Sequence, residues 1–228
     1  MAKVKLSSGA IFSGKVGGMV YSHNKSGAYV RNYVVPVNPN TRAQSETRQR
    51  FADLSNDWKG LTDAQRLTWI AAAPNFPQVD RVGNTIYLSG QGLYMKMNRN
   101  LQTARQSTIT VAPAPKVVAS PFFTTVTVDS STFSVGYTPD PLGTNDNLII
   151  ECSRVVSAGK KFAGRSSFKL VAVVAGTTIS PADIFALYNV IFGAGSLQAG
   201  SKVFIRLKIV DGLTGITSDS LQDSFVIA

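Results

Sequence analysis

The sequence TVAPAPKVVASP, residues 110–121, divides the chain into two parts of different character. It contains three prolines and follows neither the helical nor the strand period. Proline-rich stretches resist both structures and stiffen the linkers in which they occur. We therefore predict a linker over residues 110–121, with separate regions before and after it.

The charge of the chain changes at the same place. The formal net charge is +10, with 14 basic against 5 acidic residues through Ala112 and 9 against 8 from Pro113 onward. A basic segment can meet nucleic acid, an acidic protein surface or anionic lipid, or it can simply be a solvated surface. The apolar content of 44% is that of a globular protein.

After the linker, short alternating stretches are separated by turns. They are FFTTVTVD, TFSVGYTP, NLIIECSRV, FKLVAVVAG, KVFIRLKIVD, GITS and DSFVIA. About seven such strands are typical of an immunoglobulin-like or fibronectin-type sandwich, which we predict over residues 122–228. The stretch SPADIFALYNVIFGAG predicts one inserted helix, with Ser180 as its cap and Pro181 at its first position.

Before the linker, residues 41–109 predict a small helical region with about three helices. Thr41 with Gln44, and Thr62 with Gln65, have the spacing of capping boxes, which begin the first two helices. Apolar residues recur every three or four positions along these helices. The residues predicted to form the helical core are Phe51, Leu54, Trp58 and Trp69.

The third helix is predicted over SGQGLYMKMNRNLQTAR. Leu93, Met97 and Leu101 recur at a spacing of four, and Ala104 follows three residues later. Each of the three helices is marginal alone in water, so their stability requires packing against one another or against a partner.

Residues 1–40 predict an extended, glycine-rich β arm. AIFSGKVGGMVYS and GAYVRNYVVPV are rich in β-branched and aromatic residues, and the polar turn HNKSG separates them as in a hairpin. Together the three regions predict an α+β protein: a β-hairpin arm, about three short helices and an all-β sandwich with one inserted helix.

The arm contains a partial phosphate-loop pattern. Gly9 to Lys15 matches G-x-x-x-x-G-K, but Val16 stands where a magnesium-binding hydroxyl is needed. The flanking residues predict strands instead of the buried strand and following helix of such a loop. We therefore expect no nucleotide site here.

Residues for acid–base, metal or thiol chemistry are scarce. The chain has one histidine, His23, in the predicted turn, one cysteine, Cys152, and two glutamates. Cys152 alternates with apolar neighbours and is expected to be a buried, inert thiol. Asp140, Asp146 and Asn147 lack the spacing of a calcium loop and are expected to form a polar connection. We expect a non-enzymatic protein without a cofactor, a metal site or a small-molecule substrate.

No segment resembles a signal peptide, and no stretch approaches the roughly 18 apolar residues of a membrane span. The sequence therefore predicts a protein made in a cytosol, with no membrane partner.

Four motifs follow one another along the first half of the chain. They run G-x-x-G-G-x-V-Y, then G-x-Y-V-R, then P-x-N-P-x-T-x-x-Q-x-x-x-R-x-x-F, and finally W-x-x-L-T-x-x-Q-R-x-x-W. These motifs fall at Gly14 to Tyr21, Gly27 to Arg31, Pro36 to Phe51 and Trp58 to Trp69. In this pattern the chain resembles an uncharacterised family of phage and prophage proteins. The resemblance covers about residues 9–104, and family members often carry a β-sandwich after it.

The resemblance implies a virion structural component, assembled in the host cytoplasm from other virion proteins and copies of itself. Capsid decoration, head–tail connection and tail all remain open as its place in the particle. Glycines allow a backbone to lie against a neighbouring subunit or to add a strand to its sheet edge, and arginines suit bidentate carboxylate pairing. The predicted assembly interface consists of Gly14, Gly17, Gly18, Tyr21, Tyr29, Arg31, Tyr33, Arg42, Arg48 and Arg50.

Two other functions fit parts of the sequence. Tyrosines interleaved with lysine and arginine in the first half resemble the mixture used to bind nucleic acid, and incidental contact with a packaged genome is also expected under the virion hypothesis. Residues 113–228 could instead form a surface-binding or carbohydrate-binding module. A sandwich fold alone does not decide between these functions.

Overall fold

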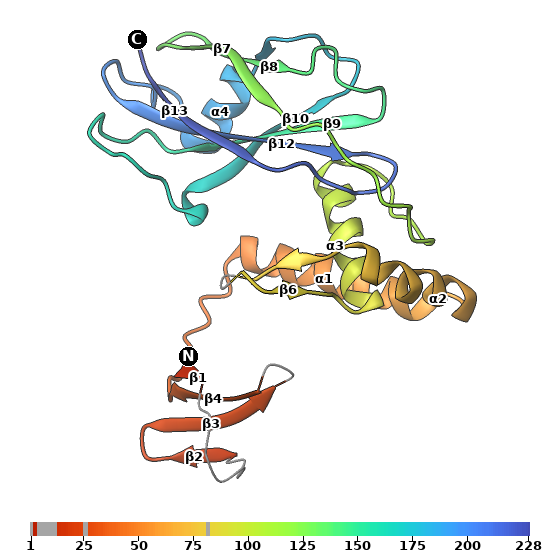
Figure 1. Ribbon diagram of the computed structural model, residues 1–228. Coiled ribbons are helices and arrows are strands. Elements are labelled where there is room, and N and C mark those ends of the chain that lie inside the picture. The colour runs from red at the N-terminus through yellow and green to blue at the C-terminus, as the bar shows by residue number, and fades with distance from the viewer. Residues whose placement is uncertain (1, 4–12, 25–26, 81–82) are drawn as a thin grey trace. The chain divides into compact units, whose positions relative to one another are not determined.

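The computed structural model describes residues 2–3, 13–24, 27–80 and 83–228 of the chain (Figure 1). Backbone contacts divide the chain into two compact units, Met1–Glu46 and Thr47–Ala228. The division therefore falls at the start of the helical region and not at the proline-rich segment. The protein combines helices with antiparallel sheets, which confirms the α+β class.

The first unit is a small antiparallel sheet with the strand order β1-β4-β3-β2. Its strands are β1 (Ala2–Lys3), β2 (Gly14–Val16), β3 (Met19–Asn24) and β4 (Gly27–Asn32). The predicted hairpin is confirmed as the β3–β4 pair, in which Tyr21 lies opposite Val30. The strand expected before it instead folds back on itself at Gly17, whose φ of 58° suits glycine, so β2 pairs with β3.

The helical region contains α1 (Arg42–Gly60), α2 (Asp63–Ala72), the 3-10 helix η1 (Ala73–Asn75) and α3 (Gly90–Thr103), with the short strands β5 (Gln78–Val79) and β6 (Thr85–Ile86) between them. Both capping boxes are confirmed. Thr41 N donates to Gln44 Oε1 at 3.3 Å, and Gln44 N donates to Thr41 Oγ1 at 3.4 Å. The corresponding distances for Thr62 and Gln65 are 2.9 and 3.3 Å.

The predicted packing of the third helix is confirmed, because Leu93, Met97, Leu101 and Ala104 are all buried. The helical core was predicted less well. Leu54 and Trp69 are buried, and Trp58 is half-buried with its ring 5.3 Å from that of Tyr94.

Phe51 is a correction to the predicted helical core, because it is 61% exposed. It lines an open groove with Leu54, Met95 and Arg99, and Leu54 is the one described residue of α1 that is fully buried. The apolar stripe on α1 was predicted correctly as a pattern, but its residues before Leu54 are exposed.

The C-terminal region contains two antiparallel sheets, with the strand orders β10-β9-β12-β13 and β11-β8-β7 (Figure 1). The strands are β7 (Phe122–Val128), β8 (Phe133–Thr138), β9 (Asp146–Ser153), β10 (Phe168–Ala175), β11 (Ala182–Asp183), β12 (Lys202–Asp211) and β13 (Leu221–Val226). The 3-10 helix η2 (Arg165–Ser167) precedes β10, and α4 (Phe185–Phe192) follows β11.

Two expectations for this region need correction. The GITS stretch makes only an isolated bridge, between Thr217 and Val210. The inserted helix begins at Phe185 and not at Pro181, because Ala182 and Asp183 pair with β8 as strand β11. Asp183 Oδ1 then accepts a 2.9 Å hydrogen bond from Phe185 N at the start of the helix.

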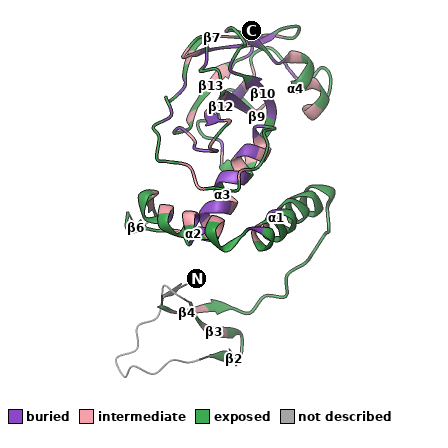
Figure 2. Cartoon of the chain, turned by 90° about the vertical axis from the view of Figure 1, so that its right-hand side faces the viewer, coloured by how far each residue is buried: buried purple, intermediate pink, exposed green. Residues whose placement is uncertain are grey.

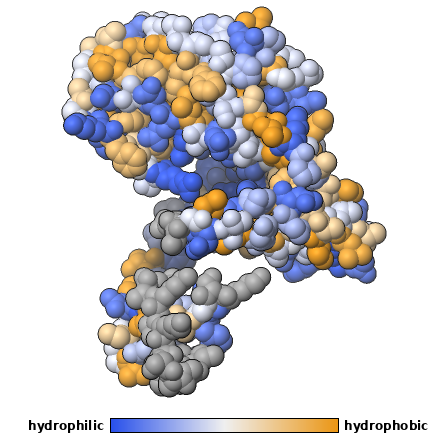
Figure 3. Space-filling view, in the orientation of Figure 1, coloured by the Kyte–Doolittle hydropathy of each residue, from blue (hydrophilic) through white to orange (hydrophobic). Residues whose placement is uncertain are grey.

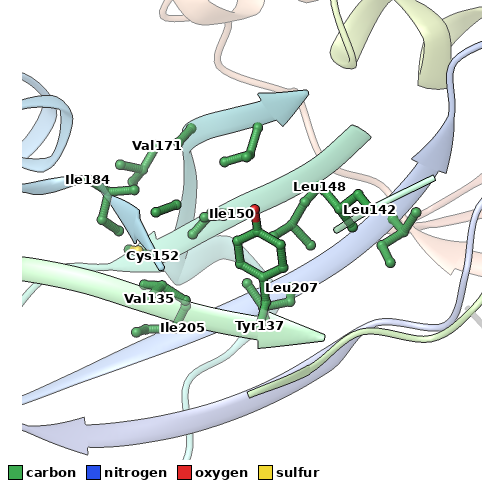
Figure 4. Packing of buried hydrophobic residues seen from close by; sticks show 14 of the residues in the cluster. Val135, Tyr137, Leu142, Leu148, Ile150, Cys152, Val171, Ile184, Ile205 and Leu207 are labelled. Carbon is green, nitrogen blue, oxygen red and sulfur yellow. The ribbon is translucent and has the colours of Figure 1, made fainter. Parts of the chain in front are cut away.

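Side chains from both sheets meet in one hydrophobic core (Figure 4). Tyr137 on β8 faces Ile150 on β9 and Leu207 on β12, and its hydroxyl donates to Thr178 O at 2.9 Å. Cys152 lies fully buried among them, as predicted, and burial strongly raises the pKa of its thiol. The same cluster includes Trp69, so the helices and the sheets share a continuous core.

The segment 110–121 has no helix or strand, as predicted, but a hydrogen bond joins it to α2 and an ion pair joins it to β12. Trp69 Nε1 donates to Thr110 O at 2.9 Å, and Lys116 Nζ lies 2.8 Å from the buried carboxylate of Asp211 on β12. Val118 is buried. The segment is therefore a packed connection between the helices and the sheets.

Asn98 on α3 fixes the start of this connection. Its side chain is fully buried; Nδ2 donates to Tyr94 O and Ile109 O at 3.1 Å, and Oδ1 accepts from Ile109 N at 2.7 Å. A buried amide that bonds to backbone groups on both sides is costly to remove, because those groups lose their partners.

We predict that Asn98→Ala lowers the free energy of unfolding by about 2–4 kcal/mol, through unpaired backbone groups and a cavity. Denaturant unfolding of the full chain measures this. Asn56→Ala on the exposed face of α1 is the matched control and should change stability by less than about 0.5 kcal/mol. Equal effects of the two substitutions would contradict the role given to Asn98.

Candidate functional site

The predicted interface residues fall on three parts of the chain. Gly14, Gly17, Gly18, Tyr21, Tyr29 and Arg31 lie within the N-terminal sheet, Tyr33 follows it, and Arg42, Arg48 and Arg50 lie on α1. Tyr33 N donates to Gly18 O at 2.7 Å and so closes the end of the sheet. The structure therefore assembles the first seven into one small unit. Arg48 and Arg50 belong to the second unit, Thr47–Ala228.

The strand register gives this sheet two different faces. Residues paired across an antiparallel sheet point to the same side, and successive residues alternate. Val16, Met19 and Tyr21 therefore share one face with Ala28 and Val30. The contact between Tyr21 and Met19, with the hydroxyl 3.8 Å from the sulfur, fits this placement. We call these five residues the apolar face.

The opposite face is basic and aromatic. Lys15, Val20 and Arg31 share it with Tyr29. Lys15 Nζ lies 3.6 Å from the ring centroid of Tyr33, a cation–π contact that orders the basic side of the sheet. The two predicted interface tyrosines of the strands, Tyr21 and Tyr29, thus point to opposite sides.

No described residue on either face is fully buried. From residue 13 to residue 53, no described residue is buried (Figure 2). Val16 and Met19 on the apolar face are 70% and 48% exposed. Figure 3 shows hydrophobic residues at the surface of this unit. A two-layered structure normally covers an apolar sheet face. The N-terminal sheet therefore presents an apolar surface for which the described residues supply no second layer.

The chain remains exposed beyond the sheet. Val34, Val35 and Val37 are 69–89% exposed in the extended segment that leads to α1. The predicted interface arginine Arg42 bonds Glu46 through Nε at 2.8 Å, a pair that is largely solvated. Arg50 instead lines the open groove beside Phe51.

The residues considered for chemistry lie apart. His23 is exposed near the end of β3, Glu46 pairs with Arg42, and Glu151 on β9 pairs with Arg206 on β12. In the phosphate-loop-like pattern, residues 9–12 lie outside the described residues, and Gly14–Val16 is strand β2. No three histidine, cysteine or acidic side chains gather as metal ligands within the described part of the chain.

A charged pocket that the sequence did not reveal lies on the outer face of the β9–β12 pair. Strand β12 points Ile205, Leu207 and Ile209 into the core, so Arg206 and Lys208 point outward. Arg165 of η2 and the β12–β13 connection complete the pocket, which has a volume of about 360 Å³. We call it the basic pocket; its lining residues are Glu151, Arg165, Arg206, Lys208, Thr217, Ser218, Asp219 and Ser220.

Helix α3 covers the adjacent part of the same sheet face. Ala104 packs there against Ile149 and Val210. Beyond this contact the outer face turns from apolar to charged, with Lys208 beside Ile149 in the register. The alternation in KVFIRLKIVD was a signal for these outward cations, but only the fold shows that they meet Arg165.

The electrostatics of the basic pocket disfavour the charge on Lys208. Partial burial lowers the pKa of its ammonium most, and the nearby cations Lys96, Arg206 and Arg165 lower it further, while Glu151 opposes them. Burial also lowers the pKa of Lys96 on α3. These cations lie close enough to one another for their charges to raise the free energy of the folded state.

The chain matches no family model, no curated protein and no solved structure. Among the described helices, none is long and apolar enough to cross a membrane. The two surfaces above, the apolar face and the basic pocket, are therefore the observations from which a function can be argued.

We predict that Lys208→Met stabilises the protein at pH 7. The pKa of Lys208 is lower in the folded state than its ordinary value of 10.5, so folding with a charged Lys208 carries a cost at all lower pH values. That cost disappears as pH rises through 10.5, because Lys208 is then neutral in both states. The difference in stability between variant and parent should therefore become smaller at high pH.

Thermal unfolding of both proteins across this pH range measures the effect. Lys161→Met, at an exposed position outside the pocket lining, is the control and should leave the melting temperature unchanged. A lower melting temperature for Lys208→Met at pH 7 would show that Lys208 makes net favourable contacts.

Proposed function

We propose that this protein is a non-enzymatic structural component of a bacteriophage particle and that it assembles through its N-terminal unit. The observation that carries the proposal is the exposure of Val16 and Met19 on the apolar face of the β1-β4-β3-β2 sheet. A sheet with exposed apolar side chains gains stability when another subunit covers them, because those side chains then leave water. The occupants we propose are copies of this chain and other virion proteins.

The resemblance to phage and prophage proteins supports the same conclusion. Its motifs fall on the turn at Gly17, on strand β4, on the extended segment after it, and on helices α1 and α2. Several motif residues are exposed, among them Arg31 and Phe51. A pattern kept for folding alone concentrates on buried positions, whereas exposed arginine and aromatic residues suit subunit contacts.

The geometry suggests how a neighbouring subunit docks. Val16, Met19 and Val30 would meet an apolar layer, while β2, at one edge of the sheet, offers backbone groups to a strand from the neighbour. Lys15 and Arg31 on the opposite face would then pair with carboxylates. Capsid decoration, head–tail connection and tail all fit this mode of assembly.

We further propose that residues 122–228 form an immunoglobulin-like sandwich that projects from the particle. Lettered in chain order as A, B, C, C′, E, F and G, the strands form the sheets E-B-A and C′-C-F-G. Immunoglobulin domains likewise divide their strands into an A-B-E set and a C-F-G set. Helix α4 occupies the connection between strands E and F.

Nucleic-acid binding is the alternative function, and the basic face of the N-terminal sheet favours it. Lys15 and Arg31 combine phosphate-binding charge with the rings of Tyr29 and Tyr33. Under this alternative, affinity for single-stranded DNA falls by orders of magnitude between about 50 and 200 mM salt. An absence of binding at the lower salt concentration would rule out the nucleic-acid-binding function.

We predict that Met19→Lys abolishes self-association of the full chain. The substitution places a charge on the apolar face, where a covered position cannot accommodate it. Ser22→Lys, on the opposite face of the same strand, is the matched control and should assemble like the parent. Sedimentation velocity gives the size of each protein, and hydrogen exchange gives the protection of residues 13–24 and 27–35.

The parent should form multimers in which these amides are protected, and Met19→Lys should sediment as a monomer with fast exchange. A monodisperse parent monomer with full amide protection across this unit would contradict the proposed function.

A further inference from the structure

We propose that the basic pocket binds an oxyanion of the phosphate type, with Lys208 and Arg165 as the groups that pair with it. The pocket lies in the second unit, on the outer face of the β9–β12 pair. The proposal is independent of assembly through the N-terminal sheet, because the two surfaces share no residue.

The charges of the pocket are not balanced within the described residues. Arg206 is paired with Glu151, and in residues 13–24, 27–80 and 83–228 no carboxylate forms an ion pair with Lys208 or Arg165. Asp219 is exposed at the same pocket and reduces its positive charge without reaching either cation. Two cations therefore remain for an anion that enters.

The pocket is held in place before any ligand arrives. Arg206 Nε donates to Glu151 Oε2 at 2.6 Å, and its guanidinium lies 4.5 Å from the ring centroid of Phe168. The hydroxyl of Ser218 accepts from Ile209 N at 3.0 Å, which fixes the β12–β13 connection against β12. Donors whose positions are already fixed bind an anion without the entropic cost of becoming ordered.

The β12–β13 connection is also fixed against α3. Asn100 Nδ2 donates to Gly215 O at 2.9 Å, and a β-carbon at Gly215 would collide with Met97 O. This contact brings Thr217 next to the end of the pocket, where its side chain lines both the basic pocket and a neighbouring hollow that contains Lys96.

A tetrahedral oxyanion suits this arrangement. The pocket is lined by Lys208 of β12, Arg165 of η2, and Thr217 and Ser220 of the β12–β13 connection. Phosphate and sulfate offer oxygens in several directions, and charge-assisted hydrogen bonds to them are the stronger kind. The negative charge of the anion would also offset the repulsion of Lys208 by Lys96, Arg206 and Arg165.

The phosphate can come from a free anion or from a nucleic-acid backbone. Beside the pocket, further hollows contain Lys96 and Lys116, and Arg50 and Arg99 lie in the next one along α3. A strand of linked phosphates would extend over these residues, whereas a free anion would stay at Lys208 and Arg165.

The test is a nuclear magnetic resonance titration of the full chain with inorganic phosphate at pH 7, with sodium chloride adjusted to hold the ionic strength constant. We expect saturable amide shifts at residues 165–167, 206–208 and 217–220. Lys208→Met and Arg165→Gln should each weaken binding about tenfold or more, because each removes a charged hydrogen-bond donor. Lys161→Met should bind like the parent.

The substitution Asp219→Asn should change phosphate affinity in the opposite direction, which a loss of folded structure could not do. It removes the one carboxylate of the pocket that is not paired with Arg206, so phosphate should bind more tightly. A second titration with oligo-deoxythymidine distinguishes the sources: a backbone ligand is weakened by Lys96→Met and Arg99→Gln, and a free anion is not.

Three results would overturn the proposal: no saturable shift with phosphate, equal weakening by Lys161→Met and Lys208→Met, or weaker binding in Asp219→Asn. Binding of a polyglutamate peptide at these residues without any effect of phosphate would also overturn it, because the pocket would then recognise acidic protein.

Discussion

An amphipathic sheet needs a second layer, and the N-terminal unit of this protein lacks one among the residues that the structure describes. Val16, Met19 and Val30 share one face of this small sheet. The hydrophobic contribution of these side chains is gained only when they leave water. We propose that another subunit supplies the missing layer, so that this unit gains stability when the protein assembles.

The second unit shows what a completed core requires. Trp69 and Tyr94 lie fully buried with their rings 5.3 Å apart and edge to face, and the same cluster continues between the two sheets. The connection 110–121 closes it through Thr110 and Lys116. In the proposed assembly, this unit carries the charged pocket and the N-terminal unit supplies the attachment. The division of roles follows the distribution of buried side chains along the chain (Figure 2).

Local patterns predicted local structure well. The capping residues Thr41 and Thr62 mark the true starts of α1 and α2, and alternation located most strands of the C-terminal sheets. The failures concern contacts between distant segments. Phe51 belongs to the apolar stripe of α1, but the pattern alone does not show which residues of the stripe another element buries. Because Ala182 and Asp183 pair with β8, helix α4 begins only after them. Lys208 and Arg165 line one pocket because the fold brings β12 and η2 together, which the sequence pattern does not show.

Electron microscopy of the assembled chain tests the central claim most directly. A map at side-chain resolution would identify whatever lies against strands β2, β3 and β4. The account predicts that a neighbouring subunit covers Val16, Met19 and Tyr21, with the chain joined to its neighbours through this sheet. An assembly in which these side chains face solvent, and in which the subunits contact one another only through residues 47–228, would contradict it.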